Sequence, residues 1–315
     1  MPEFFKVVAP EQVFAVLAGF GRTAVETVGI ADALGRTCAA AITAPEDLPP
    51  WPRATMDGYA VRAADTFGAS ESIPALFEVA GAVAMGELPG IAVGGNQAAA
   101  IPTGGFLPQD ADAVVMAEYT NPAGSGAIEI TRPVTAGENV LARAEDVTRG
   151  ETVIPAGKRL LPQEIGLLAG LGVTTVPVYR RPKVALLSTG DEIVEVTSAP
   201  PPGQIRDINS HSLAALVTAS GGEVQRFGIV PDDPELLRAA LEKALAYDLV
   251  ILSGGSSVGE RDHMATVVAS LPGAAIHAHG VAISPGKPTL VASASGKPIF
   301  GLPGHPVSAL VVAQV

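Results

Sequence analysis

The spacing of apolar residues changes twice along the chain, and each change marks a predicted domain. Near the N-terminus, apolar residues recur at intervals of three and four, which predicts an amphipathic helix over residues 10–20. Between about residues 53 and 143, short apolar runs alternate with Gly, Pro and Asn, as in antiparallel strands joined by turns. These runs, at 76–80, 98–101, 113–116 and 127–130, predict a small β-rich domain.

After Lys183 the apolar residues form continuous runs instead. Residues 184–187 and 249–252 have the pattern of parallel strands buried on both faces. Between them, the spacing predicts helices around residues 213–217 and 237–245 and a strand over 224–230. Strands alternating with helices predict a doubly wound α/β domain. A last apolar run, at 307–315, predicts a helix that is still in progress where the sequence stops, so we expect a C-terminal part to be missing.

Composition narrows the class of protein. The 315 residues are 48% hydrophobic and 17% charged, which favours a large buried core. A net charge of −12 argues against general nucleic-acid binding, because neutralising phosphates requires clustered Lys and Arg. The single cysteine, Cys38, excludes an internal disulfide framework. Without a signal peptide or an apolar run of about 18 residues, we expect a soluble cytoplasmic protein with no membrane contact.

The strongest local feature is a Gly/Ser loop after the predicted strand 249–252. The order strand, loop, acidic helix start places backbone N–H groups at the carboxyl end of a strand, where open α/β sheets bind ligands and phosphate is favoured. A plain glycine turn before a capped helix is the competing interpretation. The candidate binding residues of this loop are Gly254, Gly255, Ser256, Ser257 and Gly259.

Three further loops have the same character, so we predict one shared binding crevice. The segment 188–192 follows a predicted strand, and the segment 301–308 leads from a strand into a helix. In the segment 284–288, Lys287 stands between Gly and Pro, where its charge suits a phosphate or an oxyanion. It is not a Walker A loop, because no Ser or Thr follows the lysine. The candidate binding residues are Pro285, Gly286, Pro288, Gly304, His305 and Ser308.

Carboxylates accompany these loops. Glu192, Asp232 and Asp262 each come just after a predicted strand, and carboxylates beside phosphates commonly act through Mg²⁺. For Asp232, the sequence Pro-Asp-Asp-Pro favours a helix N-cap instead. In the β-rich part, Asp57 and Thr103 sit at glycine turns, and composition alone does not single them out.

The Gly/Ser loop also contains the G-x-S-x-G spacing of an α/β-hydrolase, at Gly255, Ser257 and Gly259. A triad of Ser257, Asp262 and His305 has the right chain order. We disfavour this alternative, because Asp262 follows the serine by only five residues and is poorly placed to orient a histidine.

Taken together, the motifs resemble those of the molybdopterin molybdenumtransferase family, which includes the E domain of gephyrin. The matching segments run collinearly through nearly the whole chain: PRATMDGYAVRAADT at 52–66, IPTGG and DADAVVM within 101–116, STGDEIV at 188–194, GQIRDINS at 203–210, GIVPDDP at 228–234, SGGSSVGERD at 253–262, SPGKP at 284–288 and GLPGHPVSA at 301–309.

The resemblance implies a reaction and roles for residues. Family members cleave adenylated molybdopterin to release AMP and place molybdate or tungstate on the dithiolene, assisted by Mg²⁺. It implies that Asp232 and Asp262 serve adenylate cleavage and bind the metal, and that Ser257, Lys287 and Pro288 border the oxyanion site. Asp57, Thr103 and Glu192 match further functional positions.

The resemblance also implies an architecture. Residues 1–50 and 141–180 would form an N-terminal helical/β domain, with residues 51–140 inserted as the β-rich domain and residues 181–315 as the α/β molybdopterin-binding domain. The resemblance also implies a C-terminal β domain, which we expect to lie beyond the given sequence. The family forms homodimers with the cleft between the α/β domain of one subunit and the β-rich domain of the other, and the molybdopterin adenylyltransferase is a pathway partner.

Three positions depart from the family pattern. His305 stands where many members have Asn, Ser284 where many have Lys, and a further Lys is missing near Gly280. These departures keep a second hypothesis open, a catalytically reduced scaffold on the same fold, beside the transferase.

Overall fold

The computed structural model describes residues 7–254 and 260–315, with the backbone alone for residues 260–263. The chain divides into two compact units, one formed by Met1–Thr27 with Pro177–Val315 and the other by Val28–Val176. The strands β1 (Val25–Gly29) and β12 (Thr175–Tyr179) pair with each other, and the division falls within this pair. We describe each unit by itself.

A six-stranded sheet forms the centre of the first unit, in the order β16-β13-β17-β20-β19-β18. The strands β13, β16, β17 and β20 are parallel, and β19 runs against both of its neighbours. Their bounds are β13 (Lys183–Thr189), β16 (Glu223–Val230), β17 (Leu249–Gly254), β18 (Ala275–His279), β19 (Leu290–Ala294) and β20 (Lys297–Leu302). The predicted doubly wound α/β domain is confirmed.

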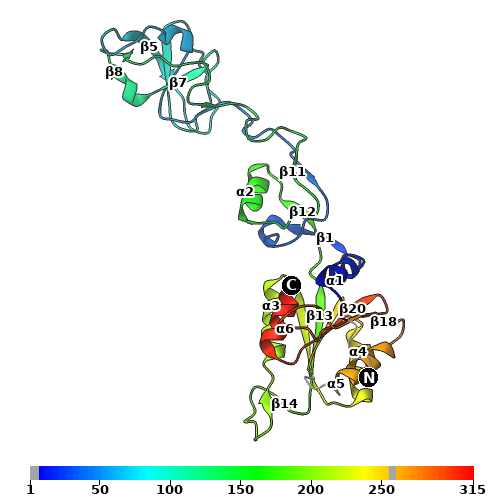
Figure 1. The fold of residues 1–315 in the computed structure, drawn as a ribbon. Coiled ribbons are helices and arrows are strands. Elements are labelled where there is room, and N and C mark those ends of the chain that lie inside the picture. Colours follow the sequence, from blue (N-terminus) through cyan, green and yellow to red (C-terminus); the bar gives the residue numbers. More distant parts are fainter. Residues whose placement is uncertain (1–6, 255–259) are drawn as a thin grey trace. The chain divides into compact units, whose positions relative to one another are not determined.

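Helices cover both faces of this sheet (Figure 1). On one face, Leu213 and Ala309 pack on Val184 and Leu186, while on the other, Leu241 packs among the alternate strand residues. Because strand side chains alternate between faces, two buried faces require the continuous apolar runs seen in the sequence. The helices are α3 (Asn209–Ala219) and α6 (Pro306–Gln314) on the first face, and α4 (Pro234–Ala244) and α5 (Glu260–Ala269) on the second.

Smaller elements complete this unit. The predicted N-terminal helix is α1 (Pro10–Leu17), shorter than expected: Phe20 lies beyond its end, where it packs edge-on against His277. The strands β14 (Ile193–Val194) and β15 (Ile205–Arg206) pair in parallel, and the proline-rich segment between them forms an arm.

At the amino ends of the parallel strands β13 and β17, Asp248 accepts hydrogen bonds from the Lys183 amide and from the Arg180 guanidinium.

The second unit contains the predicted β-rich domain. Its six strands follow the order β7-β4-β6-β5-β9-β8, antiparallel except for the parallel pair β5 and β6. Phe77, Ile130 and Val115 lie in its buried core. The bounds are β4 (Gly58–Val61), β5 (Ala75–Ala82), β6 (Gln97–Ile101), β7 (Ala113–Met116), β8 (Thr120–Pro122) and β9 (Ala127–Ile130), with 3-10 turns at Ala63–Thr66 and Ala117–Tyr119.

The remainder of this unit consists of paired chain segments. The segment that leads into the β-rich domain runs antiparallel to the segment that leaves it, first as β2 with β11 and then as β3 with β10. Their bounds are β2 (Ile42–Thr43), β3 (Arg53–Ala54), β10 (Val140–Leu141) and β11 (Thr152–Ile154), followed by α2 (Pro162–Gly170); a 3-10 turn covers Ile30–Asp32. The domain boundaries given above remain a prediction.

Candidate active site at the carboxyl edge of the parallel sheet

The central sheet has a topological switch point at β13. From β13 the chain passes through α3 on one face to β16, whereas from β17 it enters α5 on the other face. Thr189, the last residue of β13, is the register partner of both Val230 and Gly254. Loops that leave neighbouring parallel strands toward opposite faces open a crevice, which is where such sheets bind ligands.

Asp232 lies at this edge with its carboxylate held in place. The buried hydroxyl of Thr189 donates to Asp232 Oδ1 at 2.8 Å, and the backbone N–H of Asp191 donates to Asp232 Oδ2 at 3.3 Å. The Asp232 amide donates in turn to Asp191 Oδ1 at 3.2 Å. The loops after β13 and β16 are thereby joined, and the Asp232 carboxylate remains exposed to solvent.

The alternative role for Asp232, capping α4, is excluded. Asp233 performs that role, because its Oδ1 accepts from the amides of Glu235 and Leu236, both at 2.9 Å. Two adjacent aspartates therefore have different roles: Asp233 caps the helix, and Asp232 lies exposed at the carboxyl edge of the sheet.

At Gly254 the backbone of β17 lies close to the backbone of β13. A Cβ on Gly254 would lie 2.0 Å from the Thr189 carbonyl oxygen, so no side chain fits there. The predicted binding residues Gly255, Ser256, Ser257 and Gly259 lie outside the described residues. Asp262 belongs to the first turn of α5, and its side chain also lies outside the described part.

The segment 284–288 reaches the same edge of the sheet. It connects β18 to β19, and because β18 runs parallel to β20, this connection lies at the carboxyl end of the sheet. A Cβ on Gly286 would lie 2.3 Å from Val312 Cγ2 and 3.7 Å from the Ser308 carbonyl oxygen, so the loop packs against α6. Lys287 and Pro285 are exposed, and Pro288 is half-buried.

The loop after β20 completes the set. Gly304 and Ser308 are half-buried, and His305 is exposed at the N-terminal end of α6. The amide of Asn209, which sequence analysis missed, donates both to Ser253 Oγ at 2.6 Å and to the Gly304 carbonyl at 2.8 Å. Two sets of contacts therefore join segments at this edge: Asp232 contacts the loop after β13, and Asn209 contacts the end of β17 and the turn after β20. A crevice shared by the four predicted loops remains a prediction.

Two other predicted features have local explanations. Glu192 is half-buried and its carboxylate folds back over Gly190, where a Cβ would lie 2.6 Å from Glu192 Oε2. Gly280, near which the family resemblance implies a lysine, has a φ of +110°, a conformation that favours glycine.

The two predicted residues of the β-rich domain contact each other. The Thr103 amide donates to Asp57 Oδ1 at 2.7 Å and the Thr103 hydroxyl donates to the same oxygen at 2.9 Å. These bonds, the amide first, lower the pKa of Asp57 below its usual value because they stabilise the carboxylate. A solvent-exposed, ionised carboxylate with a fixed orientation results.

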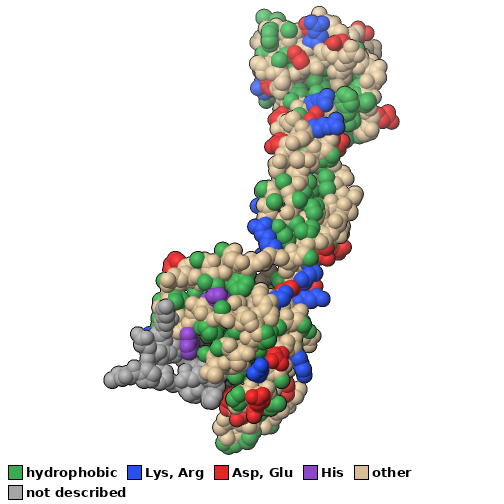
Figure 2. All heavy atoms as spheres, turned by 90° about the vertical axis from the view of Figure 1, so that its right-hand side faces the viewer, with side chains coloured by type: hydrophobic (Ala, Val, Ile, Leu, Met, Phe, Trp, Pro, Cys, Tyr) green, Lys and Arg blue, Asp and Glu red, His purple; other side chains and the backbone are tan. Residues whose placement is uncertain are grey.

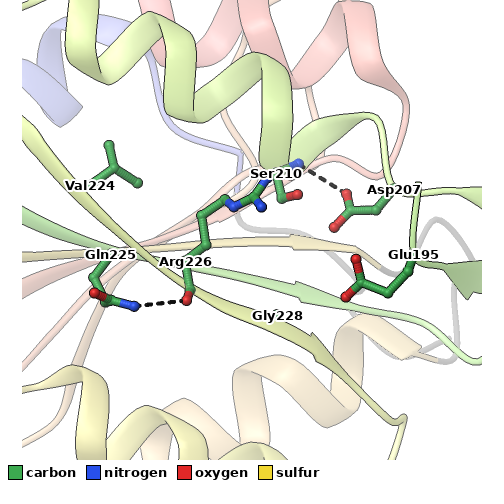
Figure 3. A pocket seen from close by; sticks show the side chains of 7 residues that line it. All are labelled: Glu195, Asp207, Ser210, Val224, Gln225, Arg226 and Gly228. Carbon is green, nitrogen blue, oxygen red and sulfur yellow. Dashed lines mark hydrogen bonds between the residues drawn. The ribbon is translucent and has the colours of Figure 1, made fainter. Parts of the chain in front are cut away.

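A pocket of about 320 Å³ lies beside the arm, and none of the predicted residues lines it (Figure 3). Arg226 from β16 points toward Ser210 at the start of α3, and Glu195 and Asp207 come from the two ends of the arm. Asp207 is occupied in accepting the Ser210 amide at 2.9 Å.

Two expectations about the class of protein, no general nucleic-acid binding and no membrane contact, can be compared with the surface and the helices. On the face shown in Figure 2, Lys and Arg side chains are scattered in small groups rather than gathered in one broad basic patch. Among the described helices, none has the length and apolar character required to cross a membrane. In the described part of the chain, no three His, Cys, Asp or Glu side chains come together as a metal-binding group.

Comparison with known proteins places this geometry in a family. Residues 8–172 match the model of the MoeA N-terminal region (domain I and II), and residues 185–315 match a probable molybdopterin binding domain. A molybdopterin molybdenumtransferase from Nostoc sp. is 41% identical over 91% of this chain and 66% of its own length, and one from Bacillus subtilis is 35% identical over 91% and 67%.

A solved structure agrees with these relatives. The molybdopterin biosynthesis moea protein from Pyrococcus horikosii superposes with a TM-score of 0.79 and 42% identity, covering 98% of this chain and 78% of that one. The chain spans about two thirds of the length of the curated relatives. These matches favour the transferase over both the scaffold and the hydrolase alternatives. The chain therefore belongs to the molybdopterin molybdenumtransferase family, enzymes of molybdenum cofactor biosynthesis.

Proposed function

We propose that the protein transfers molybdate to adenylated molybdopterin and releases AMP. The observation that carries this proposal is the placement of Asp232, which Thr189 and Asp191 hold at the switch point while Asp233 caps the helix. A carboxylate fixed by neighbouring strands, at the edge where α/β sheets bind ligands, suits work on a phosphoanhydride.

The extent of the site suits a long substrate. Four strand spacings separate β16, which precedes Asp232, from β19, which follows Lys287, and this amounts to roughly 19 Å. The adenylate end would lie near Asp232 and the Gly254 loop. The oxyanion would lie near Lys287, Pro288 and the start of α6, where an exposed ammonium group is available as a point charge.

The residues present fit Mg²⁺ as an assisting ion. Each oxygen of Asp232 accepts only one described hydrogen bond and keeps a further lone pair, and hard carboxylate oxygens are the ligands that Mg²⁺ prefers. Asp232 and Asp262 would hold the ion together with substrate phosphates, and the ion would supply positive charge against those phosphates.

The proposal also covers the oligomeric state, the location in the cell and the source of the substrate. We place Asp57, oriented by Thr103, in the same cleft, with the β-rich domain supplied by the second subunit of a homodimer. The protein would act in the cytoplasm and receive its substrate from a molybdopterin adenylyltransferase.

The reaction is tested by incubating the full-length protein with adenylated molybdopterin, Mg²⁺ and molybdate and measuring AMP. We expect Asp232→Asn to lower kcat/KM by about 10²- to 10³-fold. Asp233→Ala is the matched control and should keep the wild-type kcat/KM. The proposal fails if the wild type releases no AMP, or if Asp232→Asn releases it as fast as wild type.

The shared cleft is tested by mixing two inactive variants, Asp57→Asn and Asp232→Asn. If the cleft joins two subunits, a mixed dimer contains one intact cleft, and activity should return to about a quarter of wild type after subunit exchange. If both residues act within one subunit, mixing restores nothing.

A further inference from the structure

Asn209 connects the carboxyl end of β17 with the turn after β20. It is the first residue of α3 and is only 7% exposed. Its Nδ2 lies 2.6 Å from Ser253 Oγ and 2.8 Å from the Gly304 carbonyl oxygen. These partners are 44 and 95 residues away in the sequence, so the side chain joins segments that the chain itself does not hold together.

Chemistry fixes the orientation of this amide. The Gly304 carbonyl can only accept a hydrogen bond, so the atom that faces it must be the NH₂ group. The two N–H bonds of that group serve one partner each. No other side chain of this size offers two donors from one uncharged atom, since aspartate has none and serine has one.

Both partners border the substrate loops. Ser253, which is 1% exposed, directly precedes Gly254 and the Gly/Ser loop. Gly304 directly precedes His305, whose carbonyl accepts the Ala309 amide at 3.0 Å in the first turn of α6. We infer that Asn209 is a positioning residue, which fixes the spacing between the carboxyl end of β17 at Ser253 and the turn after β20 at Gly304.

The second polar atom of the amide is its oxygen. Asn209 Oδ1 is buried and has no hydrogen-bond partner within residues 7–254 and 264–315, so the described contacts of this side chain are made by its NH₂ group alone.

This inference rests on the proposed function for the identity of the ligand, and AMP itself is the probe. We expect Asn209→Ala and Asn209→Asp in the full-length protein to raise the Kd for AMP and the KM for adenylated molybdopterin by about tenfold or more, with a smaller change in kcat. Ser253→Ala should reproduce part of this loss. The effects of Asn209→Ala and Ser253→Ala should combine to less than their product, because they break one shared hydrogen bond.

The control is Thr218→Ala on the same helix, which removes an exposed side-chain bond to the Ala214 carbonyl. Its Kd for AMP should equal that of wild type. If Asn209→Ala does not fold, Ser253→Ala carries the comparison. A Kd and KM within twofold of wild type, with only a lower melting temperature, would overturn the positioning role. If the wild type binds AMP but produces none, the proposed reaction fails, and the AMP titration still decides the role of Asn209.

Discussion

Replacing Gly254 with alanine tests the close approach of β13 and β17 at the carboxyl edge of the sheet. The new methyl carbon would lie 2.0 Å from the Thr189 carbonyl oxygen, 2.6 Å from Thr189 Cγ2 and 2.8 Å from the Thr189 carbonyl carbon. Ordinary van der Waals contact begins at 3.4 Å, so the ends of β13 and β17 would have to separate by more than 1 Å. The obstructing atoms belong mainly to backbone in the middle of a sheet, which cannot rotate away as a flexible side chain does.

Forcing extra volume into a packed interior costs typically about 1–3 kcal/mol, and we expect Gly254→Ala to lie at or above the upper end. The assay is urea unfolding followed by circular dichroism, because Trp51 belongs to the other unit and would not report on this sheet. Gly21→Ala is the control, since nothing lies within 4 Å of its Cβ position in the same unit.

The control should be neutral or stabilised by up to about 1 kcal/mol. A free energy of unfolding for Gly254→Ala that is lower than wild type by less than about 0.5 kcal/mol would refute the close approach of the two strands. Where the variant still folds, AMP release should fall further than the folded fraction explains, because the switch-point crevice is displaced.

Three further predictions concern other residues. Asp233→Ala should lower the free energy of unfolding by about 1 kcal/mol through loss of the α4 cap, measured by urea unfolding. Thr103→Val should raise the pKa of Asp57 part of the way toward 3.8, measured by NMR titration, because the side-chain bond is lost while the backbone bond remains; Thr103→Ser should not. For Asp248, burial raises the pKa but its hydrogen bonds outweigh it and lower the pKa below 3.8. Its stabilisation is therefore present above pH 3.8 and is lost as the pH falls through the lowered value, so Asp248→Asn should destabilise at pH 7 and much less at acid pH.

Most of the sheet structure could be predicted because apolar runs are bounded by turn residues. The strands at 113–116 and 127–130 have the same bounds in the structure as in the sequence pattern. The strand β4 was missed, because Gly58–Val61 is short and its first residue belongs to the turn signal Asp57-Gly58. The arm was missed for a similar reason, since strands of two residues carry no periodicity.

The site was only partly predictable, because neighbouring residues of one type compete for one role. Asp232 and Asp233 are equally able to cap a helix, and only the backbone geometry shows which does. Asn209 was overlooked since a polar residue at a helix start is usually a cap, and its partners lie far away in the sequence. The pairing of Asp57 with Thr103 likewise depends on the fold bringing two turns together.

The paired segments at the root of the β-rich domain have a consequence for how such a protein can be built. Ala54 and Val140 are direct register partners, so the ends of the intervening stretch lie only about 5 Å apart. Joining the two residues by a tight turn should leave the pairs β3 with β10 and β2 with β11 intact, because their backbones need not move. Closing so short a gap also costs little loop entropy. The stretch between Ala54 and Val140 can therefore be exchanged, shortened or grafted at one pair of neighbouring residues, both in evolution and in protein engineering.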